Sequence, residues 1–163
     1  MRLIKTKLKD IYEISLETFT DFRGKYTEIY NKKFLEKFNI NFIQDDISTS
    51  RYSVIRGIHG DFKTWKLVTC LYGSFYLIVI DNRKNSKQFG SWTSFTLTSE
   101  NNKQILIPPG FGNGHQVLTK EAIFHYKQNT MYDRKSQFTI KYNDPKFKFV
   151  WPISNPILSD RDK

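Results

Sequence analysis

The stretch that decides the fold reads Arg56-Gly57-Ile58-His59-Gly60-Asp61-Phe62-Lys63-Thr64-Trp65-Lys66, and the apolar run 67–80 follows it at once. Its histidine lies in a glycine-flanked turn, has a cation on each side and opens onto residues of high β propensity. Such a histidine at the mouth of β-strands is typical of a proton-transfer site. The stretch therefore predicts a base that awaits an anionic substrate.

Short strand signals are dense along the rest of the chain. Gly73 separates the segments 66–72 and 74–81 and predicts a hairpin turn, and a second turn is expected at 21–24. The other predicted strands are 11–17, 25–30, 42–50, 53–59, 92–98, 104–107, 116–118, 122–127 and 138–142, and the best helix candidate is the short segment 31–38. Many short strands with polar turns predict an all-β fold: a β-sandwich, jelly roll or barrel.

Length and charge limit the classes of partner. The 163 residues predict one domain over 1–163, and 26 Lys and Arg against 16 Asp and Glu give a net charge of +10. This excess favours an anionic partner: a phosphorylated small molecule, nucleic acid or an acidic surface. The basic residues are scattered rather than gathered in a basic tail, which argues against nucleic acid.

Several absences bear on the compartment. Cys70 is the single cysteine, so no intrachain disulfide can form, and this favours a reducing compartment. Residues 1–10 are too charged for a signal peptide. No apolar stretch reaches the roughly 20 residues of a membrane span. We expect a cytoplasmic protein with no membrane partner.

Metal chemistry is not expected from the histidines. The chain has only His59, His115 and His125. They form no His-x-His pair, and no cysteine pair could replace one. Alternation along a strand also places His125 and Tyr126 on opposite faces, so the two cannot line the same cavity.

His59 is the strongest candidate base, although a turn histidine taken alone is more often a bystander. Its imidazole has an ordinary pKa near 6.5, and Arg56 and Lys66 nearby are expected to depress it. A carboxylate partner would orient the ring. Lys66 opens an otherwise apolar strand face and is expected at a cavity rim. Tyr126 is either a core tyrosine or an acid.

The glycine-rich run Pro108-Pro109-Gly110-Phe111-Gly112-Asn113-Gly114-His115 is interpreted as a tight loop. Its glycines would also allow close approach of a ligand. Neither its spacing nor its context matches a Walker loop or a dinucleotide fingerprint.

Taken in order, the motifs of this chain match one family over about residues 19–162. They are Asp21-Phe22-Arg23-Gly24, Arg56-Gly57-Ile58-His59, Lys66-Leu67-Val68, Asp81-Asn82-Arg83-Lys84-Asn85-Ser86, Phe89-Gly90-Ser91-Trp92, Leu97-Thr98-Ser99-Glu100-Asn101, Pro109-Gly110-Phe111, Tyr126-Lys127, Asn143-Asp144, Trp151-Pro152 and Leu158-Ser159-Asp160-Arg161-Asp162. The chain resembles the dTDP-4-dehydrorhamnose 3,5-epimerase family, cupin-type jelly rolls that act on nucleotide-linked 4-keto sugars. The resemblance implies no metal and no redox cofactor.

The resemblance also implies roles at the matching positions. His59 would be the base next to the sugar ketone, Asp162 its dyad partner, Lys66 the cation that stabilises the enolate, and Tyr126 the proton relay on the opposite ring face. The substrate-binding residues would be Arg23 and Arg56 for the diphosphate, Tyr26 and Tyr132 around the base, Glu28 nearby, and Gln44 against the sugar or nucleotide. A homodimer is implied in which the strand 25–30 brings Tyr26 to the partner's site.

Two stretches depart from the usual family pattern. Gly60-Asp61 follows His59 where an aromatic residue and a glutamine are usual. Asn113 and His115 stand where a histidine and an aromatic residue are usual. Because these positions belong to the sugar end of the pocket, a larger or differently substituted sugar is the hypothesis. The pattern looks like the branch that acts on GDP-linked 4-keto heptoses in capsule synthesis, with the dTDP-linked 6-deoxyhexose as the alternative.

Other readings remain open. A cupin-type ketoisomerase would also use a histidine base, although the motif set fits the epimerases better. A non-catalytic sugar-nucleotide or glycan binding module on the same fold is the rival outside enzymes. A nucleic-acid binder is the last alternative, and it predicts binding that salt weakens strongly.

Overall fold

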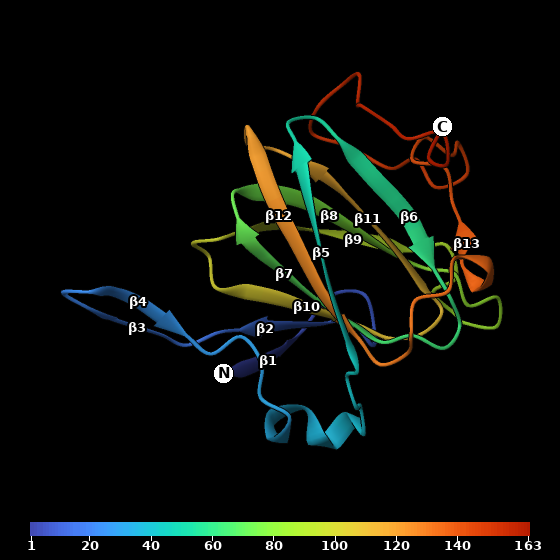
Figure 1. The fold of residues 1–163 in the computed structure, drawn as a ribbon. Helices are drawn as coiled ribbons and strands as arrows, with labels where there is room; N and C mark the ends of the chain where they lie inside the picture. The colour runs from blue at the N-terminus through green and yellow to red at the C-terminus, as the bar shows by residue number, and fades with distance from the viewer.

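Two antiparallel β-sheets form a jelly-roll sandwich in the computed structural model, which describes residues 1–163 (Figure 1). The six-stranded sheet has the order β1-β2-β10-β7-β12-β5 and the five-stranded sheet the order β13-β6-β11-β8-β9. Their strands are β1 (Arg2–Lys5), β2 (Tyr12–Ser15), β5 (Gln44–Arg51), β6 (Ile55–Gly60), β7 (Lys66–Tyr72), β8 (Ser74–Asp81), β9 (Trp92–Thr98), β10 (Lys103–Ile107), β11 (Phe111–Val117), β12 (Glu121–Gln128) and β13 (Phe138–Thr139). The all-β prediction is confirmed.

Helical structure is limited to two 3-10 helices, η1 (Lys33–Phe38) and η2 (Arg134–Ser136). The helix expected over 31–38 is thus a 3-10 helix rather than two α-helical turns. No helix of the structure has both the length and the apolar character needed to cross a membrane.

Alternating side chains divide the strands between separate apolar clusters. Val68 on β7, Phe75 on β8 and Phe124 on β12 belong to a core cluster of 14 buried residues. Leu67, which points the other way from β7, packs in a second cluster with Leu35 of η1. Each fully buried side chain of this size contributes about 1.5–3 kcal/mol to stability. The opposite facing of Leu67 and Val68 is the alternation expected of a β-strand.

The strand bounds predicted around Gly73 are confirmed for β7 and β8, as are those of β9. The tight loop predicted for 108–115 is wrong, because β11 begins at Phe111 and pairs with β6 and β8. Its glycines serve packing between strands. A Cβ at Gly112 would lie 2.8 Å from Cγ2 of Ile58, and one at Gly114 would lie 2.9 Å from Cγ1 of the same residue.

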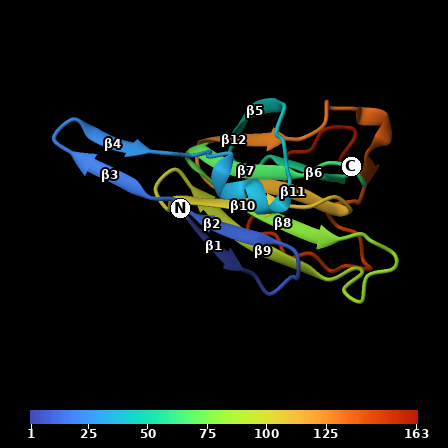
Figure 2. The same cartoon turned by 90° about the horizontal axis from the view of Figure 1, so that it is seen from below.

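The remaining strands, β3 (Thr18–Asp21) and β4 (Gly24–Thr27), form a separate hairpin. It projects from the body of the sandwich in both views (Figures 1 and 2). Phe22 at its tip is 98% exposed, and Phe19 and Tyr26 along it are also exposed. More than half of the surface of each of these aromatic residues is left open by the rest of the chain.

Candidate active site

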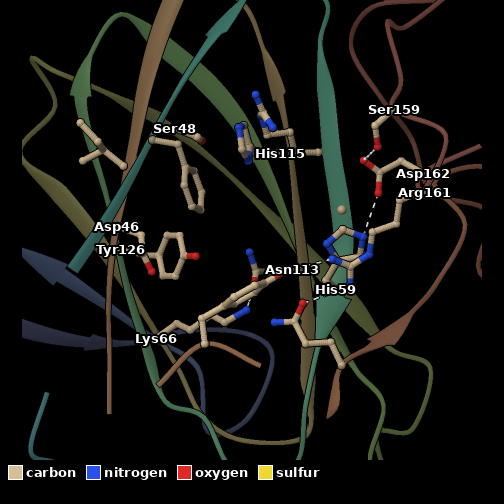
Figure 3. Close-up of a pocket in the computed structure, with 16 residues that line it drawn as sticks. Asp46, Ser48, His59, Lys66, Asn113, His115, Tyr126, Ser159, Arg161 and Asp162 are labelled. Atoms are coloured by element: carbon tan, nitrogen blue, oxygen red, sulfur yellow. Dashed lines mark hydrogen bonds and ion pairs between the residues drawn. The ribbon is translucent and has the colours of Figure 1, made fainter. Parts of the chain in front are cut away.

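A cavity of about 290 Å³ lies between the two sheets, at the side where β5 ends the larger one. Side chains from β5, β7 and β12 line it from one sheet, side chains from β6 and β11 line it from the other, and the C-terminal segment closes it (Figure 3). The predicted site residues that line it are Arg56, His59, Lys66, Asn113, His115, Tyr126, Tyr132 and Asp162. Most of the predicted site is therefore assembled within one chain.

The candidate base is paired with a carboxylate as predicted. Nε2 of His59 on β6 lies 2.8 Å from Oδ1 of Asp162, whose side chain is only 5% exposed. The hydroxyl of Ser159 donates to the other oxygen, Oδ2, at 2.8 Å. Residues 159–162 form a turn in which the amide of Asp162 donates to the carbonyl of Ser159. The turn holds the carboxylate against the imidazole and leaves Nδ1 of His59 for a bound molecule.

Burial lowers the pKa of His59 to about 4, and the positive charge of Arg161 acts in the same direction. The Asp162 carboxylate opposes both effects, and Lys66 lowers the pKa further. The prediction that Arg56 depresses this pKa is wrong, because Arg161 takes that place. At neutral pH the imidazole is unprotonated and can accept a proton.

Lys66 begins β7 and lies deeper than the predicted rim position, with only 9% of its surface exposed. Its Nζ donates to Oδ1 of Asn113 at 3.3 Å and lies 5.8 Å from the ring centroid of Tyr126. Burial lowers the pKa of Lys66 to about 8, which the Asp61 carboxylate partly offsets. At pH 7 the ammonium remains charged inside the cavity.

Tyr126 faces His59 across the cavity (Figure 3). Burial raises the pKa of its phenol, and the neighbouring Asp46 carboxylate raises it further. The phenol therefore stays protonated and can act as an acid. His125 points to the other face of β12, where its Nε2 lies 3.0 Å from Oδ1 of Asp45, so the predicted separation of His125 and Tyr126 is confirmed.

Gln44 lies behind the cavity wall rather than on it. Its side-chain oxygen accepts a hydrogen bond from the amide of Tyr132 at 2.8 Å, and its nitrogen donates to Oδ2 of Asp46 at 2.8 Å. Gln44 therefore holds two residues that do line the cavity, Asp46 and Tyr132.

The structure does not bring Arg23, Tyr26 or Glu28 to the cavity of their own chain. Arg23 lies at the tip of the β3–β4 hairpin, 77% exposed, and its Nη2 pairs with Oδ2 of Asp21 at 2.6 Å. Tyr26 is 69% exposed on the same hairpin. Glu28 follows it and accepts a hydrogen bond from the side chain of Asn31. Their contribution to a partner's site stays a prediction.

Five polar residues of the site were not predicted: Asp46, Ser48, Gln137, Ser159 and Arg161. Arg161 and Ser159 belong to the closing motif quoted above, and Arg161 donates to Tyr132 and to Gln137. Asp46 and Ser48 follow Gln44 at the alternation of a strand, which was the signal that could have found them.

The geometry supports one kind of chemistry. A neutral imidazole and a protonated phenol face each other, and a buried ammonium lies between them (Figure 3). The pair can remove a proton from one side of a bound molecule and supply one from the other, while the ammonium stabilises negative charge that develops between them. The structure contains no group of three or more His, Cys, Asp and Glu that could hold a metal ion.

Comparisons with known proteins point to one family. The family model described as dTDP-4-dehydrorhamnose 3,5-epimerase matches residues 5–163. A curated enzyme of that name from Shigella flexneri is 37% identical over 168 residues, which cover 99% of this chain and 93% of the relative.

Solved structures agree with this. The crystal structure of the enzyme from Elizabethkingia anophelis NUHP1 is 40% identical, with a TM-score of 0.91 over 99% of this chain and 93% of that one. The dTDP-6-deoxy-D-glucose-3,5-epimerase from Legionella pneumophila Philadelphia 1, in complex with dTDP-4-keto-L-rhamnose, is 34% identical, with a TM-score of 0.94 over 99% and 89% of the two chains. The chain belongs to the dTDP-4-dehydrorhamnose 3,5-epimerase family of nucleotide-sugar epimerases.

Proposed function

We propose that this protein epimerises a dTDP-linked 4-keto-6-deoxy sugar at C3, C5 or both. The observation that carries the proposal is the His59–Asp162 pair opposite Tyr126, with the buried Lys66 between them. The relative from Legionella pneumophila binds dTDP-4-keto-L-rhamnose, a sugar of this class.

The proposed reaction begins at a carbon next to the C4 ketone. Nδ1 of His59 takes the proton from that carbon. The electron pair of the broken C–H bond forms a C=C bond to C4, and the ketone oxygen becomes an enolate oxygen. Lys66, itself only 9% exposed, places a positive charge beside the enolate oxygen. Tyr126 then donates its proton to the opposite face of the same carbon, and the enolate returns to the ketone. The imidazolium of His59 afterwards releases its proton to solvent and the phenolate of Tyr126 takes one up, which restores both groups. No electron leaves or enters the substrate, so the step is an isomerisation.

Substrate binding involves residues of the cavity and of the projecting hairpin. Arg56 holds the diphosphate, since a guanidinium can donate paired hydrogen bonds to phosphate oxygens. Tyr132, supported by Gln44, packs against the nucleotide base. Arg23, Tyr26 and Glu28 complete the site from the β3–β4 hairpin of a second copy, because that hairpin projects away from its own cavity and leaves its aromatic side chains exposed. The active form is then a homodimer.

A GDP-linked 4-keto heptose of capsule synthesis is the second candidate. None of the relatives named above is an enzyme for such a sugar, so the dTDP-linked substrate leads. The observation in favour of the heptose is local: the polar side chains of Asn113 and His115 line the cavity wall at positions where the family usually has a histidine and an aromatic residue.

The test is deuterium uptake in heavy water. The protein is incubated with dTDP-linked and GDP-linked 4-keto sugars made in situ by dehydratases, and NMR follows label at C3 and C5. Uptake with the dTDP sugar alone supports the leading proposal, and the labelled carbon identifies the centre that inverts. Uptake with the GDP sugar alone supports the heptose reading.

Two variants separate catalysis from binding. His59→Asn should abolish uptake while the fold is retained, whereas His125→Asn, a buried histidine on the outer sheet face, should not. No uptake by the wild type with any of these sugars would refute the epimerase proposal and favour a non-catalytic sugar-nucleotide binding module.

A further inference from the structure

His115 lines the cavity but has no role in the proposed reaction. It lies in the middle of β11, the central strand of the five-stranded sheet, and its backbone pairs with Arg56 on β6 and Leu77 on β8. Its imidazole stacks on the ring of Phe124, with centroids 4.2 Å apart and planes 8° from parallel. The ring centroid of Phe75 lies 5.2 Å from that of His115 and 5.1 Å from that of Phe124, so the three rings form one cluster. The surroundings are those of an apolar core residue.

An apolar side chain would suit this place better, because the imidazole has no hydrogen-bond partner in the chain. His115 is 3% exposed, and its Nε2 is buried without a partner. Burying an unpaired polar group is unfavourable, so most buried polar groups in proteins are paired. The residue nevertheless lines the cavity. A polar group of a molecule bound in the cavity could therefore supply the hydrogen bond that the imidazole of His115 lacks.

The charge state narrows the kind of partner. Burial lowers the pKa of His115 to about 3, and the neighbouring Arg56 acts in the same direction, so the imidazole is neutral. A neutral imidazole has one donor nitrogen and one acceptor nitrogen. A hydroxyl group both donates and accepts, whereas phosphate oxygens need donors, which Arg56 can supply.

His115 lies away from the groups that are proposed to transfer protons, so it has no role in proton transfer. His115 lies at the Ser48 end of the cavity, apart from Lys66 and Asn113 at the other end (Figure 3). Arg56 pairs with His115 in the strand register, and its Nε donates to the hydroxyl of Ser50 at 2.8 Å. This hydrogen bond holds the guanidinium of Arg56 in place. This end of the cavity therefore combines a guanidinium with a neutral imidazole.

We propose that His115 is a specificity-determining residue that hydrogen-bonds a hydroxyl group of the bound sugar. The inference rests on the function proposed above. In the 6-deoxy sugar of the leading proposal, C2 can present that hydroxyl, since it adjoins the carbon that carries the diphosphate held by Arg56. The exocyclic carbon C6 can present one only in the heptose of the second candidate. Either would pair the buried nitrogen when the sugar binds.

Calorimetric binding of stable sugar nucleotides tests the inference without any turnover. The ligands are dTDP-glucose, its 2-deoxy form and its 6-deoxy form, together with the same three sugars on GDP. For the wild type we expect the Kd to rise about tenfold when the hydroxyl that meets His115 is removed, as for the loss of one buried hydrogen bond. The analogue that shows the rise identifies the carbon.

The decisive variant is His115→Phe, which keeps an aromatic ring on Phe124. In this variant the ratio of the Kd of the deoxy analogue to the Kd of the parent sugar nucleotide should fall to about one. His115→Gln should restore part of the ratio, and His115→Leu is a second apolar variant if the phenylalanine does not fit. His125→Gln is the matched control, a buried histidine outside the cavity, and should keep the wild-type ratio.

Three results would overturn the inference: a wild-type protein indifferent to both hydroxyls, an unchanged ratio in folded His115→Phe, or no binding of any of the six ligands. Binding that discriminates between them without deuterium uptake would refute the proposed reaction and leave the role of His115 standing.

Discussion

Replacing Asp162 with asparagine tests the dyad on which the proposed reaction depends. The substitution keeps the size of the side chain and removes the charge 2.8 Å from Nε2 of His59. The carboxamide oxygen of the variant could still accept the hydrogen bond that Ser159 now donates to the carboxylate. The change is therefore close to a pure loss of charge at a buried position.

The magnitude follows from the geometry. Both side chains are largely buried, at 19% and 5% exposure, so the charge-assisted contact is weakly screened. The carboxylate stabilises the imidazolium that forms during proton removal, and a charge-assisted contact of this kind is worth about 1.5–3 kcal/mol. Loss of about 2–3 kcal/mol in the transition state corresponds to a fall in kcat/KM of about 30- to 150-fold.

The pH profile carries a second signature. His59 must be unprotonated to act as a base, so wild-type kcat/KM should rise with pH through about 4. Because the Asp162 carboxylate raises that pKa, the asparagine variant should have its acidic limb at lower pH. In the asparagine variant, the plateau of kcat/KM should fall and the acidic limb of the profile should move to lower pH.

The assay is kcat/KM for deuterium exchange across the pH range in which circular dichroism shows an intact fold. Asp160→Asn is the matched control, since this neighbouring carboxylate is 97% exposed and pairs only with Lys163. A loss smaller than about fivefold in the Asp162→Asn variant, or an acidic limb that moves toward higher pH, would refute the dyad.

Four further outcomes are expected. Activity should fall as pH rises through about 8, where Lys66 loses its charge, and Lys66→Arg should remove that basic limb in a kcat/KM profile. Tyr126→Phe should keep deuterium uptake at one carbon but lose net inversion, as NMR of the product would show, and loss of all uptake would contradict its role as the acid. If the hairpin serves the partner's site, mixing the inactive His59→Asn and Tyr26→Ala variants should restore about a quarter of wild-type activity. Half of the dimers are then mixed, and each mixed dimer has one complete site. No recovery of activity would place Tyr26 in its own site. Finally, His115 is neutral in the fold but titrates at 6.5 when unfolded. The unfolded chain then binds the extra proton as pH falls below 6.5, so His115 alone should cost about 2 kcal/mol of unfolding free energy by pH 5, and His115→Phe should lose about that much less than the wild type in urea unfolding.

Local sequence was sufficient wherever alternation and a turn residue agreed. The predicted bounds of β7 and β8 are met because Gly73 adopts a positive φ of 70° between two apolar runs. The opposite facing of His125 and Tyr126 followed from alternation alone. The family motifs also paired His59 with Asp162, which local patterns could not have done.

Local sequence failed where the neighbour of a residue decides its role. Gly112 and Gly114 looked like loop glycines, yet they lie within β11, where Ile58 approaches too closely for a side chain. Arg161, rather than Arg56, acts on His59, since the closing turn brings it there. Lys66 is buried because Asn113 and Tyr126, from two other strands, close around it.

Sequence by itself determined the all-β class, the strands around Gly73 and the set of candidate residues, because propensity, alternation and motif order are properties of short stretches of chain. Only the tertiary structure decided which of those residues share a cavity, how far burial moves the pKa values of His59, Lys66 and His115, and that the hairpin with Arg23 and Tyr26 lies away from its own site. Desolvation and charge–charge contacts depend on side chains that are distant in sequence, so they arise only when the two sheets pack together.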